Sequence, residues 1–318
     1  METTEIIKRF EFDCHCHTNR SDGRDTPEQL IANAVKSGVY GLAIVDHDIT
    51  PPQEIAGINS LEYAKKNGLK HLILGYEFSC DKYVDDVHII GYNMDWNHPG
   101  VKAEVEAAAK SKGDAYEELC QVLTKHGMPI DFERDILCDG GSECKRTRTR
   151  DDVQRKHIFE CMAKKGYTKT WDEAKLLVRD NPHLNVERRK IDPREAIKLI
   201  HAAGGVAVLA HPFLIDERVY PDGGKLSAAK ALTREEYIER LLSADDRASS
   251  LDGMESLYTY EKTTYKGKMS RWQIRDYIEN KYANRVRFFT AGSDYHNDSS
   301  GRYIGECGLD LAEFERIF

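Results

Sequence analysis

The sequence predicts an α/β protein, a (β/α) barrel of about seven strands that is interrupted by a mainly helical insertion. Short apolar runs that end in polar residues alternate with helix signals, as expected of parallel strands that are buried on both faces. Most of these runs are joined through helices, which is the connection that parallel strands require. The alternation gives way to charge-rich helical sequence over residues 97–190 and resumes afterwards.

The first part of the predicted barrel holds four strands. Thr26 can cap a helix after the first strand, and Pro27 suits the first helical turn. The run that ends at Asp46-His47-Asp48 is almost continuously apolar, which indicates a strand buried on both faces. The strands are expected over residues 10–16, 40–45, 71–76 and 87–92, with a second helix over 52–67.

The second part resumes at Asp192-Pro193, where a capped helix is expected to begin. The strands are expected over residues 205–210, 253–257 and 286–291, with a helix over 264–280. The predicted domains are therefore a catalytic barrel over residues 1–96 and 191–318, and an insertion over residues 97–190 that caps the substrate. Within the insertion we expect a helix over 101–126 and an irregular segment over 139–144.

Composition narrows the class of protein. No apolar run approaches the ~20 residues needed to span a bilayer, and the charged start Met-Glu-Thr-Thr-Glu does not resemble a signal peptide, so we expect a cytoplasmic protein. The eight cysteines form no Cys-x-x-Cys pair, which agrees with a reducing compartment and with mostly buried thiols. A net charge of −8 argues against binding of long nucleic acid and leaves short RNA open.

The stretch from Phe12 to Gly23 carries the first candidate site. Residues two apart on a strand face the same way, so His15 and His17 project together. Asp22 follows in a Ser-Asp-Gly turn that can return a carboxylate to the same point. This pattern indicates half of a metal shell, although two ordinary histidines on a half-buried strand would explain it equally well in isolation.

Further histidines and carboxylates follow the later strands, and in a barrel such strand ends meet on one rim. Imidazole and carboxylate ligands suit Zn, Mn or Fe, and the set is large enough for two or three ions. Such a cluster can hold a bridging hydroxide and clamp both oxygens of a phosphoryl displacement. The alternative to a metal site is that these are scattered polar residues whose side chains are satisfied by hydrogen bonds. That alternative requires six separate coincidences of residue type and position in the fold. The histidines and carboxylates that follow the later strands are His47, Glu77, His211, Asp294 and His296.

The ordered set of motifs resembles the PHP (polymerase and histidinol phosphatase) family of metal-dependent phosphoesterases. The motifs are Asp13-Cys14-His15-Cys16-His17, Ser21-Asp22-Gly23, Asp46-His47-Asp48, Gly75-Tyr76-Glu77, His88 before Ile-Ile-Gly-Tyr, Ala210-His211-Pro212 and Gly292-Ser293-Asp294-Tyr295-His296. The resemblance implies a distorted seven-stranded TIM-like barrel. It also implies a site for two or three divalent ions in which Glu77 is the bridging carboxylate.

Nine metal ligands carry over from the family pattern. They are His15, His17, Asp22, His47, Glu77, His88, His211, Asp294 and His296. Glu77, His211 and Asp294 are the candidate catalytic residues among them. Asp13, Asp46 and Asp48 neighbour ligands, and we expect them to orient imidazole rings rather than to bind metal.

The insertion resembles that of the free-standing PHP phosphoesterases, which include nucleotide phosphatases, an exoribonuclease and a cyclic phosphate dihydrolase. Those proteins carry Gly-Arg-Pro-His before a helix that ends in Gly-Tyr. Here Gln154-Arg155-Lys156-His157 precedes a helix that ends at Gly166-Tyr167, so Arg155 and His157 match the family pattern while Gln154 and Lys156 depart from it. A solvated helical face is the alternative meaning of this basic run. The predicted substrate-binding residues are Arg148, Arg150, Arg155 and His157.

Three functions are consistent with these residues. The first is hydrolysis of small phosphorylated sugars or nucleotides by a metal-bound hydroxide, as monoesters or cyclic diesters such as phosphoribosyl 1,2-cyclic phosphate. The second is a 5′-nucleotide or 3′,5′-bisphosphate phosphatase, or a 5′-to-3′ exoribonuclease on short RNA. The third is a non-catalytic metal or phosphate sensor, against which the intact ligand set argues.

Overall fold

The computed structural model describes residues 10–138, 145–184, 186–221, 231–243 and 249–318. The chain divides into two compact units. We call them the barrel unit, Met1–Lys102 with Lys190–Phe318, and the inserted unit, Ala103–Arg189. The predicted irregular segment over 139–144 lies outside the described residues.

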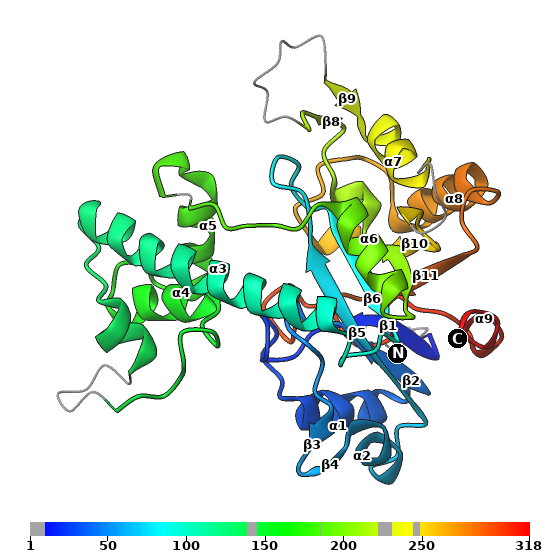
Figure 1. Ribbon diagram of the computed structural model, residues 1–318, viewed down its shortest axis with the longest axis horizontal. Coiled ribbons are helices and arrows are strands. Elements are labelled where there is room, and N and C mark those ends of the chain that lie inside the picture. Colours follow the sequence, from blue (N-terminus) through cyan, green and yellow to red (C-terminus); the bar gives the residue numbers. More distant parts are fainter. Residues whose placement is uncertain (1–9, 139–144, 185, 222–230, 244–248) are drawn as a thin grey trace, which may run out of the picture. The chain divides into compact units, whose positions relative to one another are not determined.

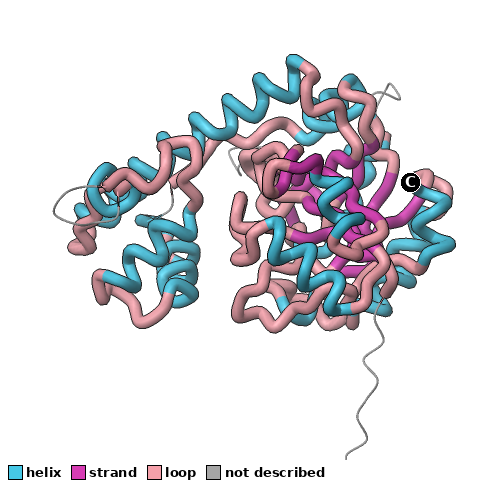
Figure 2. The backbone as a smooth tube through the Cα atoms, turned by 90° about the horizontal axis from the view of Figure 1, so that it is seen from below, coloured by secondary structure: helices cyan, strands magenta, loops and turns pink. Residues whose placement is uncertain are grey.

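The barrel unit is built around one seven-stranded sheet, whose strands lie at the centre with helices around them (Figures 1 and 2). The strand order is β1-β2-β5-β6-β7-β10-β11. The first and last strands are joined where the His17 N–H donates to the Tyr295 carbonyl over 2.9 Å, so the barrel is nearly closed. The predicted distorted barrel is confirmed. The strands are β1 (Phe12–Cys16), β2 (Gly41–Ile44), β5 (His71–Ser79), β6 (His88–Tyr92), β7 (Val206–Leu209), β10 (Gly253–Tyr258) and β11 (Phe288–Gly292).

All neighbouring strands of this sheet run parallel except at β6, which is antiparallel to both β5 and β7. The direction of β6 has a consequence for the site, because it places the first residue of that strand at the edge where the parallel strands end. His88 is that first residue. Two further pairs of short antiparallel strands lie in the described part of the chain. They are β3 (Glu54–Ile55) with β4 (Ile58–Asn59), and β8 (Arg218–Val219) with β9 (Leu232–Thr233).

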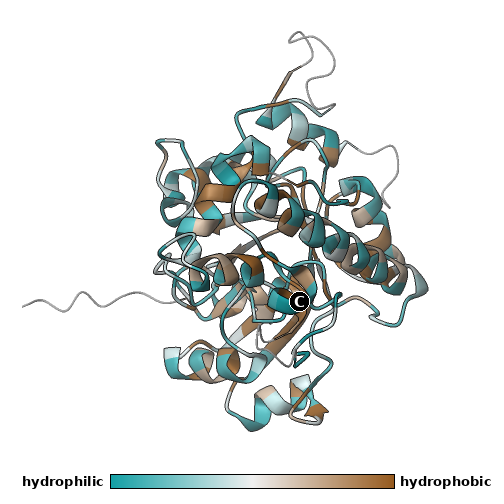
Figure 3. Ribbon diagram, turned by 90° about the vertical axis from the view of Figure 1, so that its left-hand side faces the viewer, coloured by the Kyte–Doolittle hydropathy of each residue, from teal (hydrophilic) through white to brown (hydrophobic). Residues whose placement is uncertain are grey.

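Among the described residues, six α-helices belong wholly to the barrel unit, and side-chain caps explain where several of them begin. Thr26 caps α1 as predicted and forms a capping box with Gln29, and Asp192 accepts hydrogen bonds from backbone N–H groups at the start of α6. The helices show mixed hydrophilic and hydrophobic faces (Figure 3), as expected when one face packs on the sheet. They are α1 (Pro27–Ser37), α2 (Ser60–Lys66), α6 (Pro193–Ala202), α7 (Arg234–Leu242), α8 (Arg271–Tyr282) and α9 (Leu311–Ile317).

The predicted helix over 52–67 is half wrong. Its first part is the β3–β4 hairpin, in which Ala56 and Gly57 both have positive φ angles, 51° and 74°. Such a turn suits the twist of a hairpin and cannot continue a right-handed helix. The helix α2 starts only at Ser60, where the Asn59 side chain accepts two backbone N–H groups. Similarly, α8 starts at Arg271, later than predicted, because Ser270 and Gln273 form its capping box.

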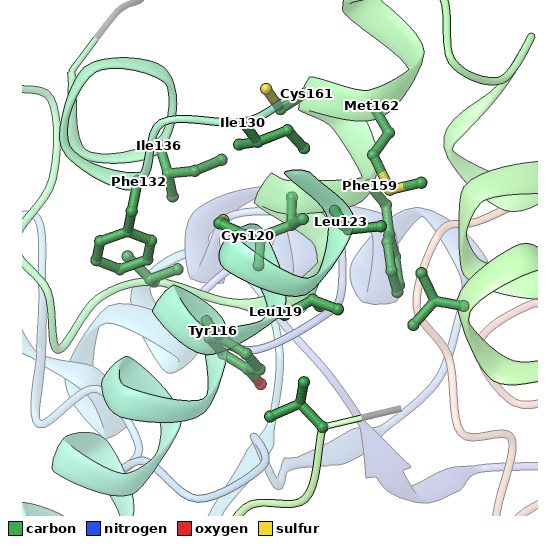
Figure 4. Packing of buried hydrophobic residues seen from close by; sticks show 14 of the residues in the cluster. Tyr116, Leu119, Cys120, Leu123, Ile130, Phe132, Ile136, Phe159, Cys161 and Met162 are labelled. Atoms are coloured by element: carbon green, nitrogen blue, oxygen red, sulfur yellow. The ribbon is translucent and has the colours of Figure 1, made fainter. Parts of the chain in front are cut away.

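The inserted unit is helical and has its own apolar core. The helix α3 (Pro99–Lys125) begins in the barrel unit and continues into the inserted unit, where it is followed by a π-helical turn (Phe132–Leu137). The other helices are α4 (Arg155–Lys164) and α5 (Trp171–Asp180). Leu119 and Leu123 of α3 pack with Phe159 and Met162 of α4 in one buried cluster (Figure 4).

The two ends of the inserted unit are tied together by a salt bridge. The Arg189 guanidinium contacts both carboxylate oxygens of Glu104, each over 2.7 Å. The Arg189 backbone N–H also donates to Ser111 Oγ over 2.8 Å. The chain therefore enters and leaves this unit at neighbouring points.

We expect Leu123→Ala to lower the free energy of unfolding by about 2 to 5 kcal/mol, because Leu123 is fully buried and its truncation leaves a cavity. Urea denaturation of the full chain measures this loss. Leu176→Ala on α5 is the control, because Leu176 is 45% exposed, and it should change stability by less than about 0.5 kcal/mol. Equal losses in the two variants would contradict the packing described for this cluster.

Most of the cysteines are buried thiols, as predicted, but one of them is in a disulfide. Six of them are free and buried, at positions 14, 16, 80, 120, 161 and 307. Cys138 is disulfide-bonded, which spacing along the sequence did not indicate because pairing depends on proximity in the fold. No helix in the described part of the chain is long and apolar enough to cross a membrane.

Candidate metal centre

The nine predicted ligands lie together at the edge of the barrel where the parallel strands end. His15 lies in β1, and His17 follows that strand directly; both side chains are fully buried. Glu77 lies in β5 and His88 begins β6. The remaining ligands follow strand ends or lie in adjacent loops, and they are Asp22, His47, His211, Asp294 and His296.

Glu77 lies at the centre of this cluster, and its Oε2 atom faces one set of histidines. That oxygen is 3.1 Å from His47 Nδ1 and 3.2 Å from His17 Nε2. It is also 3.3 Å from His15 Nε2. One carboxylate oxygen is thus shared by imidazoles from two strands.

The other oxygen of Glu77 faces a second set of histidines. Oε1 lies 3.0 Å from His88 Nδ1 and 3.2 Å from His211 Nε2. Because the two oxygens address different histidines, the carboxylate has the placement of a group that bridges two cations.

The two aspartates complete the cluster on the side of His17. Asp294 Oδ1 is 3.1 Å from His17 Nε2, and Asp22 Oδ1 is 3.0 Å from His296 Nε2. Three overlapping groups within the described residues bring their ligand atoms within 4.8 Å of one another. They are His17, Asp22, His47 and His296; His15, His17 and Glu77; and His47, Glu77 and His88.

The donor set fits divalent cations. His15 Nε2 and His17 Nε2 face each other over 3.1 Å, and His88 Nδ1 faces His211 Nε2 over 3.2 Å. Two imidazole nitrogens at this distance converge on one point, and buried carboxylates surround them. Nitrogen and oxygen lone pairs that face one another interact poorly among themselves. They are suitable ligands for Zn, Mn or Fe.

Electrostatics keep the central carboxylate ionised. Burial acts to raise the pKa of Glu77, but the neighbouring His47, His15 and His88 outweigh it and hold that pKa well below its usual range. Burial also lowers the pKa of His47 to about 4, so its ring is neutral and offers a lone pair. The ionised form of Glu77 and the neutral form of His47 are the forms in which these two side chains bind metal.

His17 behaves differently from His47. Burial acts to lower its pKa, but hydrogen bonds to the carboxylates of Asp294 and Glu77 prevail and raise the pKa to about 10. A cation that binds at His17 must therefore displace a proton. Metal binding releases protons in this way at any site whose ligands are protonated before the ion binds.

Asp13, Asp46 and Asp48 fasten the strand ends that carry the candidate ligands. Each carboxylate accepts hydrogen bonds from the backbone N–H and the hydroxyl group of one Ser or Thr, over 2.5 to 3.0 Å. These partners are backbone and hydroxyl groups, whereas the sequence led us to expect that the three aspartates orient imidazole rings. The pairs are Asp13 with Ser293, Asp46 with Thr18 and Asp48 with Ser79.

Three residues that contact the candidate ligands were not predicted from the sequence. Tyr258 donates its hydroxyl to Asp294 Oδ2 over 2.6 Å, and Arg302 Nη1 donates to the same oxygen over 2.5 Å. The third is Glu255 of β10, a buried acid within an otherwise apolar or hydroxyl-bearing strand. A charged residue in such a run was the available signal for Glu255, whereas nothing local to the sequence links Arg302 to Asp294.

The four predicted substrate-binding residues lie in the inserted unit, and two of them have structural partners there. Arg150 pairs with Asp114 over 2.8 Å and with Glu117, while Arg148 donates to the Ile136 carbonyl. These contacts account for both guanidinium groups within the unit. Their role in binding substrate remains a prediction.

Arg155 and His157 begin the helix α4. Among the described residues no carboxylate pairs with Arg155, whose guanidinium carbon lies 5.9 Å from the centre of the Tyr116 ring. His157 Nδ1 accepts the Gln154 backbone N–H over 3.0 Å. Burial lowers the pKa of His157 to about 3, with the positive Arg148 acting in the same direction, so the ring is neutral. The described part of the chain therefore offers the Arg155 guanidinium no carboxylate partner.

A family model of the PHP domain matches residues 13–186, which is more than half of the chain. The chain belongs to the PHP domain family. The recognition from motifs is thereby confirmed, and the chain is an enzyme of the metal-dependent phosphoesterase class.

Similar proteins agree with the PHP assignment. A 5′-3′ exoribonuclease of Haemophilus influenzae is 28% identical over 95% of this chain and 96% of its own length. A phosphoribosyl 1,2-cyclic phosphate 1,2-diphosphodiesterase of Eggerthella lenta is 25% identical over 64% of this chain and 74% of its own length. The crystal structure of a protein of Bifidobacterium adolescentis, described as a metal-dependent phosphoesterase, has the same fold with a TM-score of 0.69, 23% identity and coverage of 96% and 94% of the two chains.

Proposed function

We propose that this PHP-family phosphoesterase hydrolyses phosphate esters of small phosphorylated sugars or nucleotides, as monoesters or cyclic diesters, with two or three divalent ions at the nine ligands. The placement of Glu77 carries the proposal, because its two carboxylate oxygens address separate sets of histidines. When bound, divalent ions lower the pKa of water and neutralise charge that develops on phosphoryl oxygens.

The side chains around the ions have separate tasks in this proposal. The ionised Glu77 would serve as a ligand shared by two cations. Tyr258 and Arg302 occupy Asp294 Oδ2, so Oδ1 is the oxygen that faces the histidines. His211 and Asp294 are our candidates for moving a proton to the leaving oxygen.

Short RNA hydrolysed from its 5′ end is the second candidate substrate. The Haemophilus influenzae exoribonuclease favours it, because that similarity extends along nearly the whole of both chains and includes the inserted unit. The cyclic phosphate diesterase is similar over a smaller share of this chain. Short 5′-phosphorylated RNA is therefore the substrate to test first beside small nucleotides.

Metal analysis of the purified chain followed by a phosphate-release screen tests the proposal. The panel contains an aryl phosphate, 5′-nucleotides, 3′,5′-bisphosphates, cyclic sugar phosphates and a 5′-phosphorylated oligoribonucleotide. We expect two or three ions per chain and hydrolysis of at least one phosphorylated nucleotide or sugar. A chain that binds ions and hydrolyses no member of the panel would contradict the proposal and favour a sensor.

A salt titration separates the two candidate substrates. Binding of RNA should weaken steeply as salt rises, because each phosphate contact releases condensed counterions. Hydrolysis of a molecule with only two phosphates should depend on salt mildly.

For a substrate with a second, distant phosphate, we expect Arg155→Ala to lower kcat/KM by about ten- to a hundredfold, since a hydrogen bond to a charged group contributes about 1.5 to 3 kcal/mol. Hydrolysis of a simple aryl phosphate should barely change. Arg155→Lys should also be impaired, because a bidentate contact depends on guanidinium geometry as well as on charge. Steady-state kinetics on both substrates measure these effects.

Arg146→Ala is the matched control for Arg155. Arg146 belongs to the same basic run, is exposed, and pairs with Glu133 over 3.1 Å. Its removal should leave kcat/KM unchanged on both substrates. Equal losses on both substrates in Arg155→Ala would assign that residue to support of the metal centre, and no loss would return it to a solvated helical face.

A further inference from the structure

The strand β10 contributes none of the nine predicted ligands of the metal centre. Its Glu255 nevertheless contacts two of those ligands, His15 and His211. The Glu255 side chain is 1% exposed. Its Oε1 atom lies 3.3 Å from His15 Nδ1, and its Oε2 atom accepts the backbone N–H of His211 over 2.8 Å. One buried carboxylate therefore joins ligands that come from β1 and from the end of β7.

The direction of the His15 ring determines which of its nitrogens can bind a cation. His15 Nε2 faces the cluster, 3.1 Å from His17 Nε2 and 3.3 Å from Glu77 Oε2. A cation at this point needs the lone pair of Nε2, so the proton of the neutral ring must sit on Nδ1. His15 Nδ1 is then a donor, and Glu255 Oε1 accepts from it.

Glu255 thus faces two donors, the His15 Nδ1–H and the His211 backbone N–H. Two donors require two acceptors, and among side chains of this size only an ionised carboxylate offers one acceptor oxygen to each. A glutamine of the same shape offers one acceptor and one donor. The site is therefore specific for a carboxylate and not merely for a polar side chain.

The contact with His211 has a second effect. His211 has a φ angle of 28°, a backbone conformation that residues other than glycine rarely adopt. The hydrogen bond from its N–H to Glu255 holds the backbone in this conformation. The same backbone directs His211 Nε2 toward Glu77 Oε1, at 3.2 Å.

We propose that Glu255 is a positioning residue of the metal centre, which fixes the His15 proton on Nδ1 and the His211 backbone in its unusual conformation. The inference rests on the proposed metal centre. A carboxylate that accepts from the second nitrogen of a ligating histidine orients the ring and strengthens its lone pair, and its removal lowers metal affinity. Glu255 acts through the two ligands and does not itself contact substrate.

Glu255→Gln tests the proposal through Zn²⁺ affinity, measured on the full chain by competition with a chromophoric chelator. We expect the affinity to fall by about ten- to a hundredfold. If the amide donates to His15 Nδ1, the proton moves to Nε2 and blocks the ligand; if it accepts there, its N–H₂ group faces the His211 N–H. Glu255→Asp keeps two acceptors and should lose less affinity than Glu255→Gln.

Ser256→Ala is the control on the same strand. Ser256 points away from the metal centre and donates to Glu279 of α8 over 2.8 Å, so its removal should leave Zn²⁺ affinity unchanged. Wild-type affinity in a folded Glu255→Gln variant would overturn the inference. Failure of the wild-type chain to bind Zn²⁺ would instead overturn the proposed metal centre, and the two failures are thereby distinguished.

A second measurement does not depend on the folding of any variant. Long-range ¹H–¹⁵N NMR of the Zn²⁺-loaded wild-type chain reports which nitrogen of His15 carries the proton. We expect the proton on Nδ1. A proton on Nε2 would overturn the proposed role of Glu255.

Discussion

Glu77→Gln is expected to remove at least one metal ion and to lower hydrolysis by at least about a hundredfold, because bridging ions stabilise the transition state by several kcal/mol and each 1.4 kcal/mol is tenfold in rate. A neutral amide is a poor bridge between two cations. The five histidines that now surround the two carboxylate oxygens would keep only the weaker partner. Metal content by mass spectrometry and phosphate release measure the two losses.

The barrel should remain folded in this variant, since Gln has nearly the same shape as Glu and the apolar contacts of β5 are retained. Circular dichroism and urea denaturation check this. Glu195→Gln is the control, because Glu195 is an exposed residue of α6 that pairs only with Lys198 among the described residues. A Glu77→Gln variant that retains all its ions and its activity would contradict the bridging role.

Removal of the metal ions from the wild-type chain is expected to lower hydrolysis by more than about a thousandfold, since the loss of several kcal/mol of charge stabilisation has this effect. Carboxylates and imidazoles donate electron pairs to metal ions, so the ions supply most of the positive charge that developing phosphoryl oxyanions need. Titration of the chelated chain with Mn²⁺, Zn²⁺ or Fe²⁺ should restore phosphate release. Restoration should be complete at two or three ions per chain.

A calcium titration is the control for this experiment, because Ca²⁺ prefers oxygen ligands and fits a histidine-rich site poorly. Phosphate release that survives complete chelation would contradict a metal-dependent reaction.

Much of the barrel could be predicted because its strands are buried on both faces and so appear as apolar runs. The direction of β6 could not be read from such a run, since an apolar strand has the same pattern whichever way it points. The short connection from Ser79 to His88, which holds no helix, was the available signal, because a parallel neighbour requires a longer crossover. The β3–β4 hairpin was missed because it depends on a positive φ angle at Ala56, a residue that also favours helices.

The candidate ligands could be predicted because each combines a suitable residue type with a place at a strand end. The residues that support them could not, because their contacts join distant parts of the chain. Glu255 meets His15 from another strand, and Arg302 meets Asp294 from a loop. The basic run in the insertion could not be interpreted for the same reason. The carboxylates that pair with Arg150 lie on α3, far from it in the sequence, so the charges next to Arg150 do not predict them.

The salt bridge between Glu104 and Arg189 affects the order in which the chain can fold. Strands β6 and β7 pair from Tyr92 to Val206, so this pairing closes a loop of roughly 110 residues if the intervening chain is unfolded. Once the inserted unit has folded, its joined ends leave only about 25 flexible residues to close, which lowers the entropic cost by about 1 kcal/mol. During synthesis the insertion emerges before β7, and so it can bring the two halves of the barrel together before His211, Asp294 and His296 complete the site.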